Sequence, residues 1–276
     1  MIDTSRLPGW LEETGALSRR AGEAILDAVR SLGEVEHKED GSPVTRADKA
    51  AHRVIMDGLL ALAPDLTVIS EEGDLEGTVA AAGDAFWLVD PLDGTKEFIK
   101  GRPEYTVNIA LVEDAVPILG AIYVPAADRL YLGARGHGAR RVDSGGTAFL
   151  SPASVDRPRS AVVSRSHLTP PTEELLERLG ITERASFGSS LKMCAVAEGM
   201  AHIYPRLGPT CLWDTAAGSA IALGAGCAVV GLDGHPLRYE PAAGLKHPGF
   251  LVSAPGGCLE ACRPALVELG AVAQRS

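Results

Sequence analysis

Apolar runs that end directly on acidic residues are the feature of this sequence that most constrains its fold. Residues 67–70 lead into Glu71, and residues 86–89 lead into Asp90. Short runs rich in β-branched and aromatic residues predict strands. Open α/β folds bind their ligands at such strand ends, beside the starts of helices. Asp214, at the start of a predicted helix, is a third acidic residue in this kind of position.

Periodic hydrophobic patterns predict a helical start to the chain, followed by an antiparallel sheet. Residues 10–32 and 46–62 place apolar side chains at helical intervals, and the polar stretch 33–45 between them has the composition of a loop. Several β-rich runs joined by turns follow, and they indicate an antiparallel meander. These runs are 105–112, 118–123 and 130–132.

The chain changes character near residues 151–158, which are rich in proline, serine and charge. Beyond them, short β-rich runs alternate with helical stretches, which is typical of an α/β arrangement. We therefore expect an N-terminal α+β lobe over residues 1–150 and a C-terminal α/β lobe over residues 151–276. The strands expected in the second lobe are 161–163, 202–204, 228–230 and 250–253, and the helices are 173–179, 190–198, 215–223 and 259–269.

The composition is that of an ordinary soluble protein with an excess of acidic residues. Of 276 residues, 46% are hydrophobic and 22% are charged, and the net charge is −10. A protein with this charge repels nucleic-acid backbones, so a nucleic-acid-binding role is disfavoured. Clustered carboxylates instead favour divalent cations, which offset their mutual repulsion.

The cysteines and the N-terminus favour a reducing, cytoplasmic setting. The five cysteines are odd in number and lack zinc-like paired spacing, which argues against a disulfide framework or a structural zinc site. We see no signal peptide, and no run approaches the roughly 18 to 20 apolar residues that span a bilayer. We expect no transmembrane segment. Peripheral attachment to the cytoplasmic face of the inner membrane stays open.

The run Asp90-Pro91-Leu92-Asp93-Gly94-Thr95 has the composition of a metal-binding turn. Pro91 fixes one backbone angle and Gly94 permits a tight turn, so the two aspartates can converge on neighbouring cations. The Leu92 carbonyl would face the same ions. The following N–H groups of Gly94 and Thr95 would suit a phosphate oxygen. The alternative interpretation is an ordinary surface turn.

Hard oxygen ligands without histidine or cysteine favour magnesium or manganese over zinc. Two such ions about 3.5 to 4 Å apart can clamp a phosphoryl group and activate a water. Thr95 and Asp48 are the candidate pair for orienting that water, with the hydroxyl relaying a proton to the carboxylate. Asp48 has an equally good interpretation as a charge at a helix start.

Three blocks of residues together resemble the inositol monophosphatase superfamily of magnesium-dependent, lithium-sensitive phosphatases. They are residues 71–73 (E-E-G), 87–95 (W-L-V-D-P-L-D-G-T) and 213–218 (W-D-T-A-A-G). Further runs are similar to the CysQ-type 3'(2'),5'-bisphosphate nucleotidases, and the resemblance covers nearly the whole chain. These runs are 42–48, 96–100, 105–110, 164–167, 188–192 and 204–206.

The resemblance implies a layered α/β/α/β/α sandwich and two or three Mg²⁺ ions per active site. One ion would be held by Glu71, Asp90 and the Leu92 carbonyl, and a second by Asp90, Asp93 and Asp214. A third would involve Glu71 and water near Asp48. The implied reaction converts adenosine 3',5'-bisphosphate to AMP and phosphate, by in-line attack of a water that Thr95 and Asp48 activate. Adenosine 3'-phosphate 5'-phosphosulfate is a further implied substrate, and the implied role supports sulfate assimilation.

A doubly phosphorylated substrate brings more negative charge than the metal ions alone would offset. Lys192, Arg206, His167 and Lys96 are candidates to pair with its second phosphate, and a solvated surface charge is the alternative for each. The full set of expected substrate contacts is Glu71, Leu92, Asp93, Gly94, Thr95, Ser164, His167, Gly188, Ser190, Lys192, Arg206 and Asp214.

Other functions stay open at this point. A phosphatase of the same superfamily that acts on inositol monophosphate or a sugar bisphosphate would share the chemistry and differ only in its pocket. A non-catalytic sensor would bind nucleotide or metal without turnover, but such a protein would usually have lost Thr95, Asp48 or a metal carboxylate. The sequence does not distinguish a monomer from a homodimer.

Overall fold

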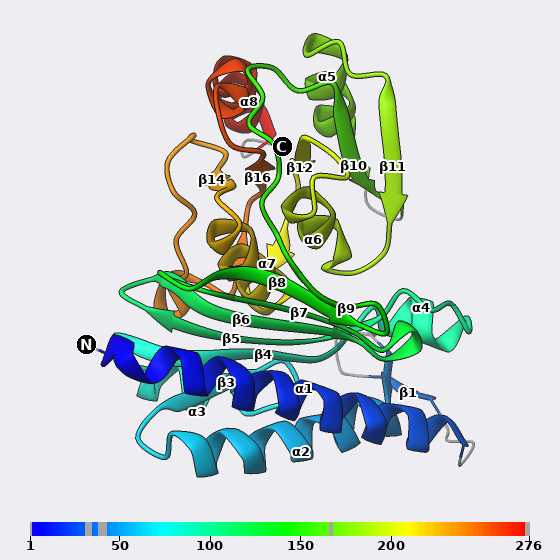
Figure 1. Cartoon of the computed structure of the whole chain (residues 1–276), viewed down its shortest axis with the longest axis vertical. Coiled ribbons are helices and arrows are strands. Elements are labelled where there is room, and N and C mark those ends of the chain that lie inside the picture. Colours follow the sequence, from blue (N-terminus) through cyan, green and yellow to red (C-terminus); the bar gives the residue numbers. More distant parts are fainter. Residues whose placement is uncertain (1, 31–34, 38–42, 166–167, 274–276) are drawn as a thin grey trace.

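The computed structural model describes residues 2–30, 35–37, 43–165 and 168–273, and helices and sheets alternate in it as α/β/α/β/α layers (Figure 1). The first layer is a pair of amphipathic helices, α1 (Leu7–Arg30) and α2 (Arg46–Leu62). On α2, Ala47, Ala51, Ile55 and Leu59 are buried, and their spacing of four places them on one face. The expected helix at 46–62 is therefore confirmed, and α1 begins three residues before the expected start.

The second layer is a seven-stranded sheet whose strands follow one another in chain order from β3 to β9. β3 runs parallel to β4, and every later pair is antiparallel, which confirms the expected meander. Strands β8 and β9 were not predicted. The strands are β3 (Thr67–Ser70), β4 (Ala85–Asp93), β5 (Thr106–Glu113), β6 (Val116–Val124), β7 (Arg129–Ala134), β8 (Gly138–Asp143) and β9 (Gly146–Phe149).

The third layer consists of α6 (Leu191–Ala197) and α7 (Leu212–Gly224), which lie between the two large sheets (Figure 1). Helix α7 packs directly on β5, β6 and β7. Two glycines permit this close approach. A Cβ on Gly120 would lie 2.4 Å from the Ala217 carbonyl oxygen, and one on Gly133 would lie 2.6 Å from the Ile221 Cα.

The fourth layer is a five-stranded sheet in the order β11-β10-β12-β16-β14, and the fifth layer is α5 and α8. The α/β alternation expected for this half of the chain is confirmed, except that β11 was missed. The elements are β10 (Ser160–Ser164), α5 (Pro170–Arg178), β11 (Glu183–Phe187), β12 (Ile203–Arg206), β14 (Ala228–Gly231), β16 (Phe250–Ser253) and α8 (Cys258–Ala273).

Several short elements connect these layers. The stretch expected to be a plain loop, 33–45, contains a strand pair, because β1 and β2 form an antiparallel ladder that joins Val35 to Thr45. Residues 33, 34 and 38–42 lie outside the described residues. The remaining short elements are η1 (Thr4–Arg6), β1 (Val35–His37), β2 (Pro43–Thr45), α3 (Leu75–Ala81), α4 (Thr95–Ile99), η2 (Pro125–Ala127), β13 (Thr210–Cys211), η3 (Pro241–Ala243) and β15 (Lys246–His247).

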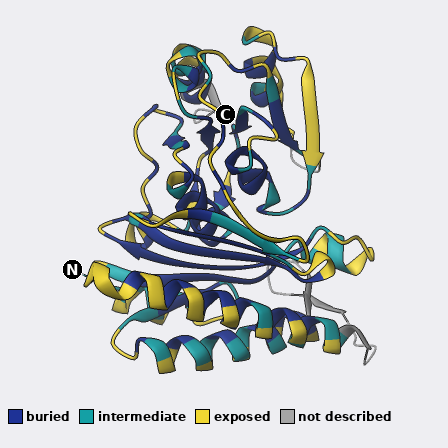
Figure 2. Cartoon of the chain, viewed as in Figure 1, coloured by how far each residue is buried: buried dark blue, intermediate teal, exposed yellow. Residues whose placement is uncertain are grey.

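The buried side chains form a continuous core between the two large sheets. One cluster joins Ile69 and Phe86 of the first sheet to Tyr204 and Phe250 of the second, with α6 and α7 between them. Figure 2 shows this dark interior, and also the exposed outer faces of α1 and α2. The first sheet ends at residue 149 and the second begins at residue 160. The proposed division at 150/151 falls in this connection and stays a prediction.

Within the described residues, each helix is too short or too polar to span a bilayer.

The packing of α7 on the sheet predicts a specific weak point. Gly120→Ala should lower the free energy of unfolding by about 2 kcal/mol, because the added methyl group overlaps the α7 backbone in a filled core. Gly9→Ala is the matched control, since nothing lies within 4 Å of a Cβ there and alanine favours the helix. Urea denaturation compares the two variants. An unchanged midpoint for Gly120→Ala would contradict the close packing.

Candidate active site

A bulge in β4 brings two aspartates to the same face of the first sheet. Asp90 lies opposite Asn108 on β5 and Asp93 lies opposite Thr106, so three steps along β4 match two steps along β5. In a regular strand, residues three apart point to opposite faces. The extra residue of the bulge brings Asp93 back to the face that carries Asp90. Of the expected turn at Asp90–Thr95, Asp90 to Asp93 thus lie within β4 as a bulge. Gly94, whose φ is +91°, then turns the chain into α4, which begins at Thr95.

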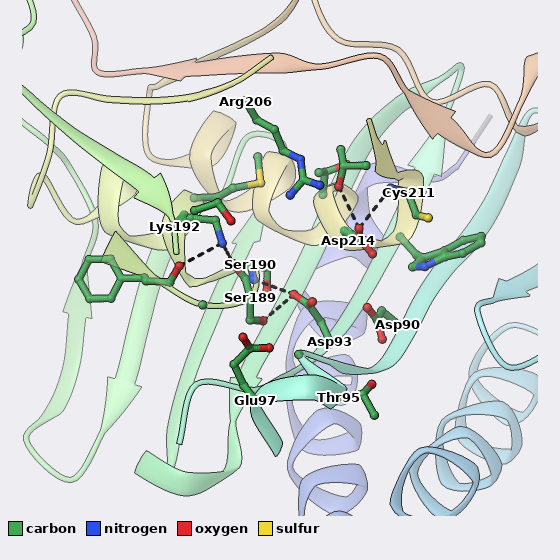
Figure 3. A pocket seen from close by; sticks show the side chains of 18 of the residues that line it. Asp90, Asp93, Thr95, Glu97, Ser189, Ser190, Lys192, Arg206, Cys211 and Asp214 are labelled. Carbon is green, nitrogen blue, oxygen red and sulfur yellow. Dashed lines mark hydrogen bonds between the residues drawn. The ribbon is translucent and has the colours of Figure 1, made fainter. Parts of the chain in front are cut away.

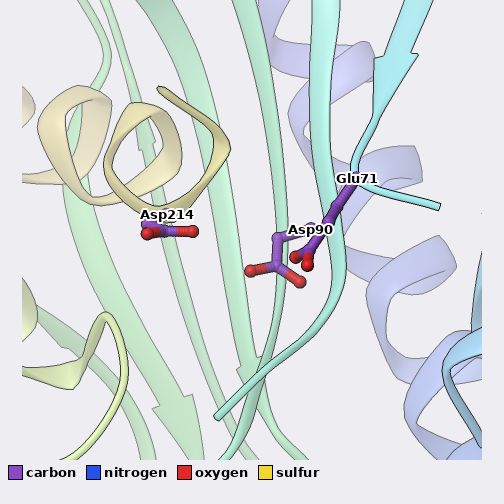
Figure 4. A group of neighbouring side chains, drawn as sticks. All are labelled: Glu71, Asp90 and Asp214. Carbon is purple, nitrogen blue, oxygen red and sulfur yellow. The ribbon is translucent and has the colours of Figure 1, made fainter. Parts of the chain in front are cut away.

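Glu71 and Asp214 join these aspartates from other elements. The Glu71 N–H donates to the Val89 carbonyl at 3.1 Å, which holds the end of β3 beside β4. Asp214 lies in the first turn of α7 and therefore comes from the other half of the chain. Carboxylate oxygens of Glu71, Asp90 and Asp214 all lie within 4.8 Å of one another, and Figure 4 shows the three side chains pointing toward a shared space.

Burial and mutual repulsion perturb these carboxyl groups. Burial raises the pKa of Asp90 well above its ordinary value, and the nearby charges of Glu71 and Asp93 raise it further. Burial and the charge of Asp93 raise the pKa of Asp214 to about 7, although a hydrogen bond from Thr210 opposes this shift. The cluster would therefore be stabilised by a cation. Its all-oxygen donors suit Mg²⁺ or Mn²⁺.

Thr95 and Asp48 meet at the edge of this cluster. The Thr95 hydroxyl lies 3.2 Å from Asp48 Oδ1 and 3.1 Å from the Leu92 carbonyl oxygen, so it can donate to either. Asp48 is buried and lies in the first turn of α2. Asp48 is thus both an acidic residue at a helix start and a hydrogen-bond partner of Thr95, and its part in orienting a water stays a prediction.

A cavity of about 290 Å³ connects the acidic cluster to basic residues (Figure 3). Lys96 and, from the second half of the chain, Arg165, Lys192 and Arg206 line it together with the carboxylates. Lys192 is buried, and its ammonium group donates to the carbonyls of Phe187 and Ser189. Its Nζ also lies 5.5 Å from the centre of the Tyr204 ring, a cation–π contact within the cavity wall.

The structure gathers nearly all of the predicted site residues around this cavity. Asp48 reaches it through Thr95, and His167 lies outside the described residues. Gly188 and Ser190 use their N–H groups within the protein, because Gly188 donates to Glu104 and Ser190 donates to Asp93. The individual roles stay predictions. The residues that line the cavity as expected are Glu71, Asp90, Leu92, Asp93, Gly94, Thr95, Ser164, Gly188, Ser190, Lys192, Arg206 and Asp214.

Several residues that shape this site have no predicted role. Arg165, on the cavity wall, forms a bidentate ion pair with Glu104, whose two carboxylate oxygens lie 2.6 and 2.9 Å from the guanidinium nitrogens. Ser189 donates to Asp93, and Thr210 donates to Asp214. The runs 105–110 and 188–192 resemble those of a known family, but no local pattern indicates that their polar side chains meet.

The raised pKa of Asp214 predicts how the metal-free protein responds to pH. The folded carboxyl keeps its proton up to about pH 7, whereas the ordinary value is 3.8, so the folded state binds the extra proton between these values. Stability should therefore fall as the pH rises through this window. Asp214→Asn should reduce the fall by up to about 1.4 kcal/mol per pH unit.

Urea unfolding in a chelating buffer across this window measures the effect. Asp65→Asn is the matched control, because Asp65 is exposed. An unaltered pH profile for Asp214→Asn would contradict the proposed repulsion.

Comparison with known proteins places this geometry in a family. The Inositol monophosphatase family matches residues 10–268. The 3'(2'),5'-bisphosphate nucleotidase CysQ of Shigella flexneri is 48% identical over 246 residues, which cover 88% of this chain and 99% of that protein. CysQ of Escherichia coli strain K12 is 47% identical over the same shares of the two chains.

Solved structures agree with this placement. A crystal structure of CysQ from Bacteroides thetaiotaomicron has a TM-score of 0.74 and 41% identity, and it covers 86% of this chain and 94% of its own. An inositol monophosphatase from Anabaena shares the fold with a TM-score of 0.74 at 24% identity, and it covers 96% of this chain and 97% of its own. The expected layered sandwich is thereby confirmed, and the chain belongs to the inositol monophosphatase family.

Proposed function

We propose that this protein is a magnesium-dependent 3'(2'),5'-bisphosphate nucleotidase that converts adenosine 3',5'-bisphosphate to AMP and phosphate. One observation carries the proposal: a single cavity has a cluster of carboxylates on one side and the basic side chains of Lys192 and Arg206 on another. Such a cavity suits a substrate with two separated phosphates, one at a metal centre and one at fixed cations. Adenosine 3'-phosphate 5'-phosphosulfate has the same arrangement of charge and is a second proposed substrate.

The relatives support this specificity. The CysQ proteins named above align with this chain over 99% of their own length, so the comparison includes both sides of the cavity. We propose residues 1–150 as the lobe that carries most of the metal ligands. Residues 151–276 would supply Asp214 and the basic residues Lys192 and Arg206. The proposed role is the removal of a by-product of sulfate assimilation.

We propose a separate set of ligands for each ion. Glu71, Asp90 and the Leu92 carbonyl would hold one Mg²⁺, and Asp90, Asp93 and Asp214 would hold a second. A third would lie near Glu71 and Asp48. When bound, the ions supply positive charge beside the phosphoryl oxygens and lower the pKa of a water.

The chain itself supplies the proton path. Thr95 orients the attacking water, whose proton passes to the threonine oxygen while the threonine proton moves to Asp48, 3.2 Å away. The water oxygen forms the new bond to phosphorus in line with the breaking bond to the ribose 3'-oxygen. That oxygen leaves with a proton from solvent. No phosphoenzyme forms, because the nucleophile is the water.

A panel of substrates tests the specificity. With Mg²⁺, phosphate release from adenosine 3',5'-bisphosphate should exceed release from inositol monophosphate and from fructose 1,6-bisphosphate, and lithium should inhibit it. A clear preference for the inositol substrate would instead favour the alternative activity within the same family. Absence of turnover on every phosphate, with the metal present, would favour a sensor.

Replacing a basic side chain of the pocket should show which of the two phosphates it contacts. Arg206→Gln should raise the KM for adenosine 3',5'-bisphosphate about tenfold or more, because a charge-assisted hydrogen bond contributes about 1.5 to 3 kcal/mol. The matched control is adenosine 3'-phosphate, which lacks the 5'-phosphate and should show little change. Equal effects on both substrates would contradict the proposed contact.

The Thr95 hydroxyl should matter for the chemical step. Thr95→Ala should lower kcat about 10² to 10³-fold with little change in KM, because it removes the group that orients the water. Thr95→Ser keeps the hydroxyl and is the matched control. Steady-state kinetics at saturating Mg²⁺ measures both variants, and a fully active Thr95→Ala would overturn the proton path.

A further inference from the structure

Two serines from the second half of the chain hold one oxygen of Asp93. The Ser189 hydroxyl donates to Asp93 Oδ2 at 2.5 Å, and the Ser190 N–H donates to the same oxygen at 2.7 Å. Figure 3 shows both bonds reaching Asp93 from the segment before α6. With Oδ2 engaged by two donors, Oδ1 is the oxygen that this carboxylate offers to a cation.

The backbone of Ser189 is itself in a disfavoured conformation. Its φ is +53°, in the left-handed region that residues other than glycine rarely adopt. The Lys192 ammonium group donates to the Ser189 carbonyl, and the side chain of Ser189 lies near Gly94, where an added Cβ would be 3.6 Å away. Such a conformation persists only where surrounding contacts compensate for it. These contacts direct the hydroxyl at Asp93.

Thr106 extends the hydrogen-bond network into β5. Its hydroxyl lies 2.6 Å from the Ser189 hydroxyl and 2.9 Å from that of Ser190. Because Ser189 donates its only proton to Asp93, the single Thr106 proton can go to Ser189 or to the Asn108 side-chain carbonyl. The Asn108 side-chain carbonyl lies 2.9 Å from both the Thr106 and the Ser190 hydroxyls. Thr106 lies opposite Asp93 and Asn108 opposite Asp90, so the network follows the two bulged aspartates along the sheet.

We infer that Ser189 and Thr106 are positioning residues for the cation site, because they fix which oxygen of Asp93 faces the acidic cluster. The N-terminal half supplies Asp90 and Asp93, but the orientation of Asp93 depends on a turn from the other half. Groups that orient a ligand in this way typically change metal affinity or activity about 10 to 100-fold when removed. The inference rests on the proposed function, since it concerns the same metal centre.

Two substitutions of Ser189 separate its hydroxyl from its backbone conformation. Ser189→Ala removes the hydroxyl and keeps the left-handed strain, whereas Ser189→Gly removes the hydroxyl and relieves the strain. Both variants should bind Mn²⁺ at least about tenfold more weakly than the unaltered protein. Water-proton relaxation with Mn²⁺ as the paramagnetic probe measures this without substrate.

Thr106 provides a second, independent pair of variants. Thr106→Val should weaken Mn²⁺ binding in the same direction, and Thr106→Ser, which keeps the hydroxyl, should restore it. Ser144→Ala is the matched control, because Ser144 is exposed in the turn between β8 and β9. In turnover, Ser189→Gly should need more Mg²⁺ for half-maximal rate, while its KM for adenosine 3',5'-bisphosphate at saturating Mg²⁺ stays within about twofold.

The outcomes distinguish this inference from the proposed function. If Ser189→Gly binds Mn²⁺ as tightly as the unaltered protein, the hydroxyl does not position Asp93 and the inference is overturned. If Ser189→Ala fails to fold, Ser189→Gly still decides, since it lacks the strained side chain. If the unaltered protein does not hydrolyse the bisphosphate, the proposed function fails, and the Mn²⁺ affinities still test the positioning role.

Discussion

Repulsion among carboxylates brought together from both halves of the chain is the constraint around which this site is arranged. Burial and neighbouring charge raise the pKa of Asp90 and of Asp214, and few folded proteins tolerate such a cluster without compensation. Hydrogen bonds from neighbouring residues offset part of this repulsion, because Thr210 donates to Asp214, and Ser189 and Ser190 donate to Asp93. A divalent cation would supply the remaining compensation, which is why the same arrangement serves metal-dependent chemistry.

Rigid packing makes this crowded arrangement possible. Helix α7 carries Asp214 in its first turn and lies against the first sheet, where Gly120 and Gly133 permit backbone contact. The position of Asp214 relative to Asp90 is therefore set by a helix and a sheet in direct contact rather than by a loop. The basic side of the cavity is also held by packing, because Lys192 is buried and its ammonium group donates to the carbonyls of Phe187 and Ser189.

Much of the fold could be predicted because its signals are local. The helix at 46–62 and the strands at 67–70 and 250–253 match the structure residue for residue, since their periodicity and their flanking residues are visible in short windows. Strands β8, β9 and β11 were missed. Strands β9 and β11 are largely exposed and carry little hydrophobic pattern. The paired strands β1 and β2 lie where the sequence predicts a loop, because this polar stretch has the composition of one.

The candidate site likewise has features that local sequence signals predict and features that they do not. The acidic residues and Thr95 could be named from the sequence, because strand ends, the D-P-L-D-G-T run and a family resemblance all point to them. That Asp90 and Asp93 share a face was decided by a bulge, which depends on pairing with Asn108 and Thr106 of another strand. The contact between Ser189 and Asp93 joins residues 96 positions apart and leaves no periodic trace. The sequence by itself determined which chemical groups are present, whereas only the tertiary structure decided which oxygen atoms face one another, because hydrogen bonds between distant segments form only once both sheets are packed.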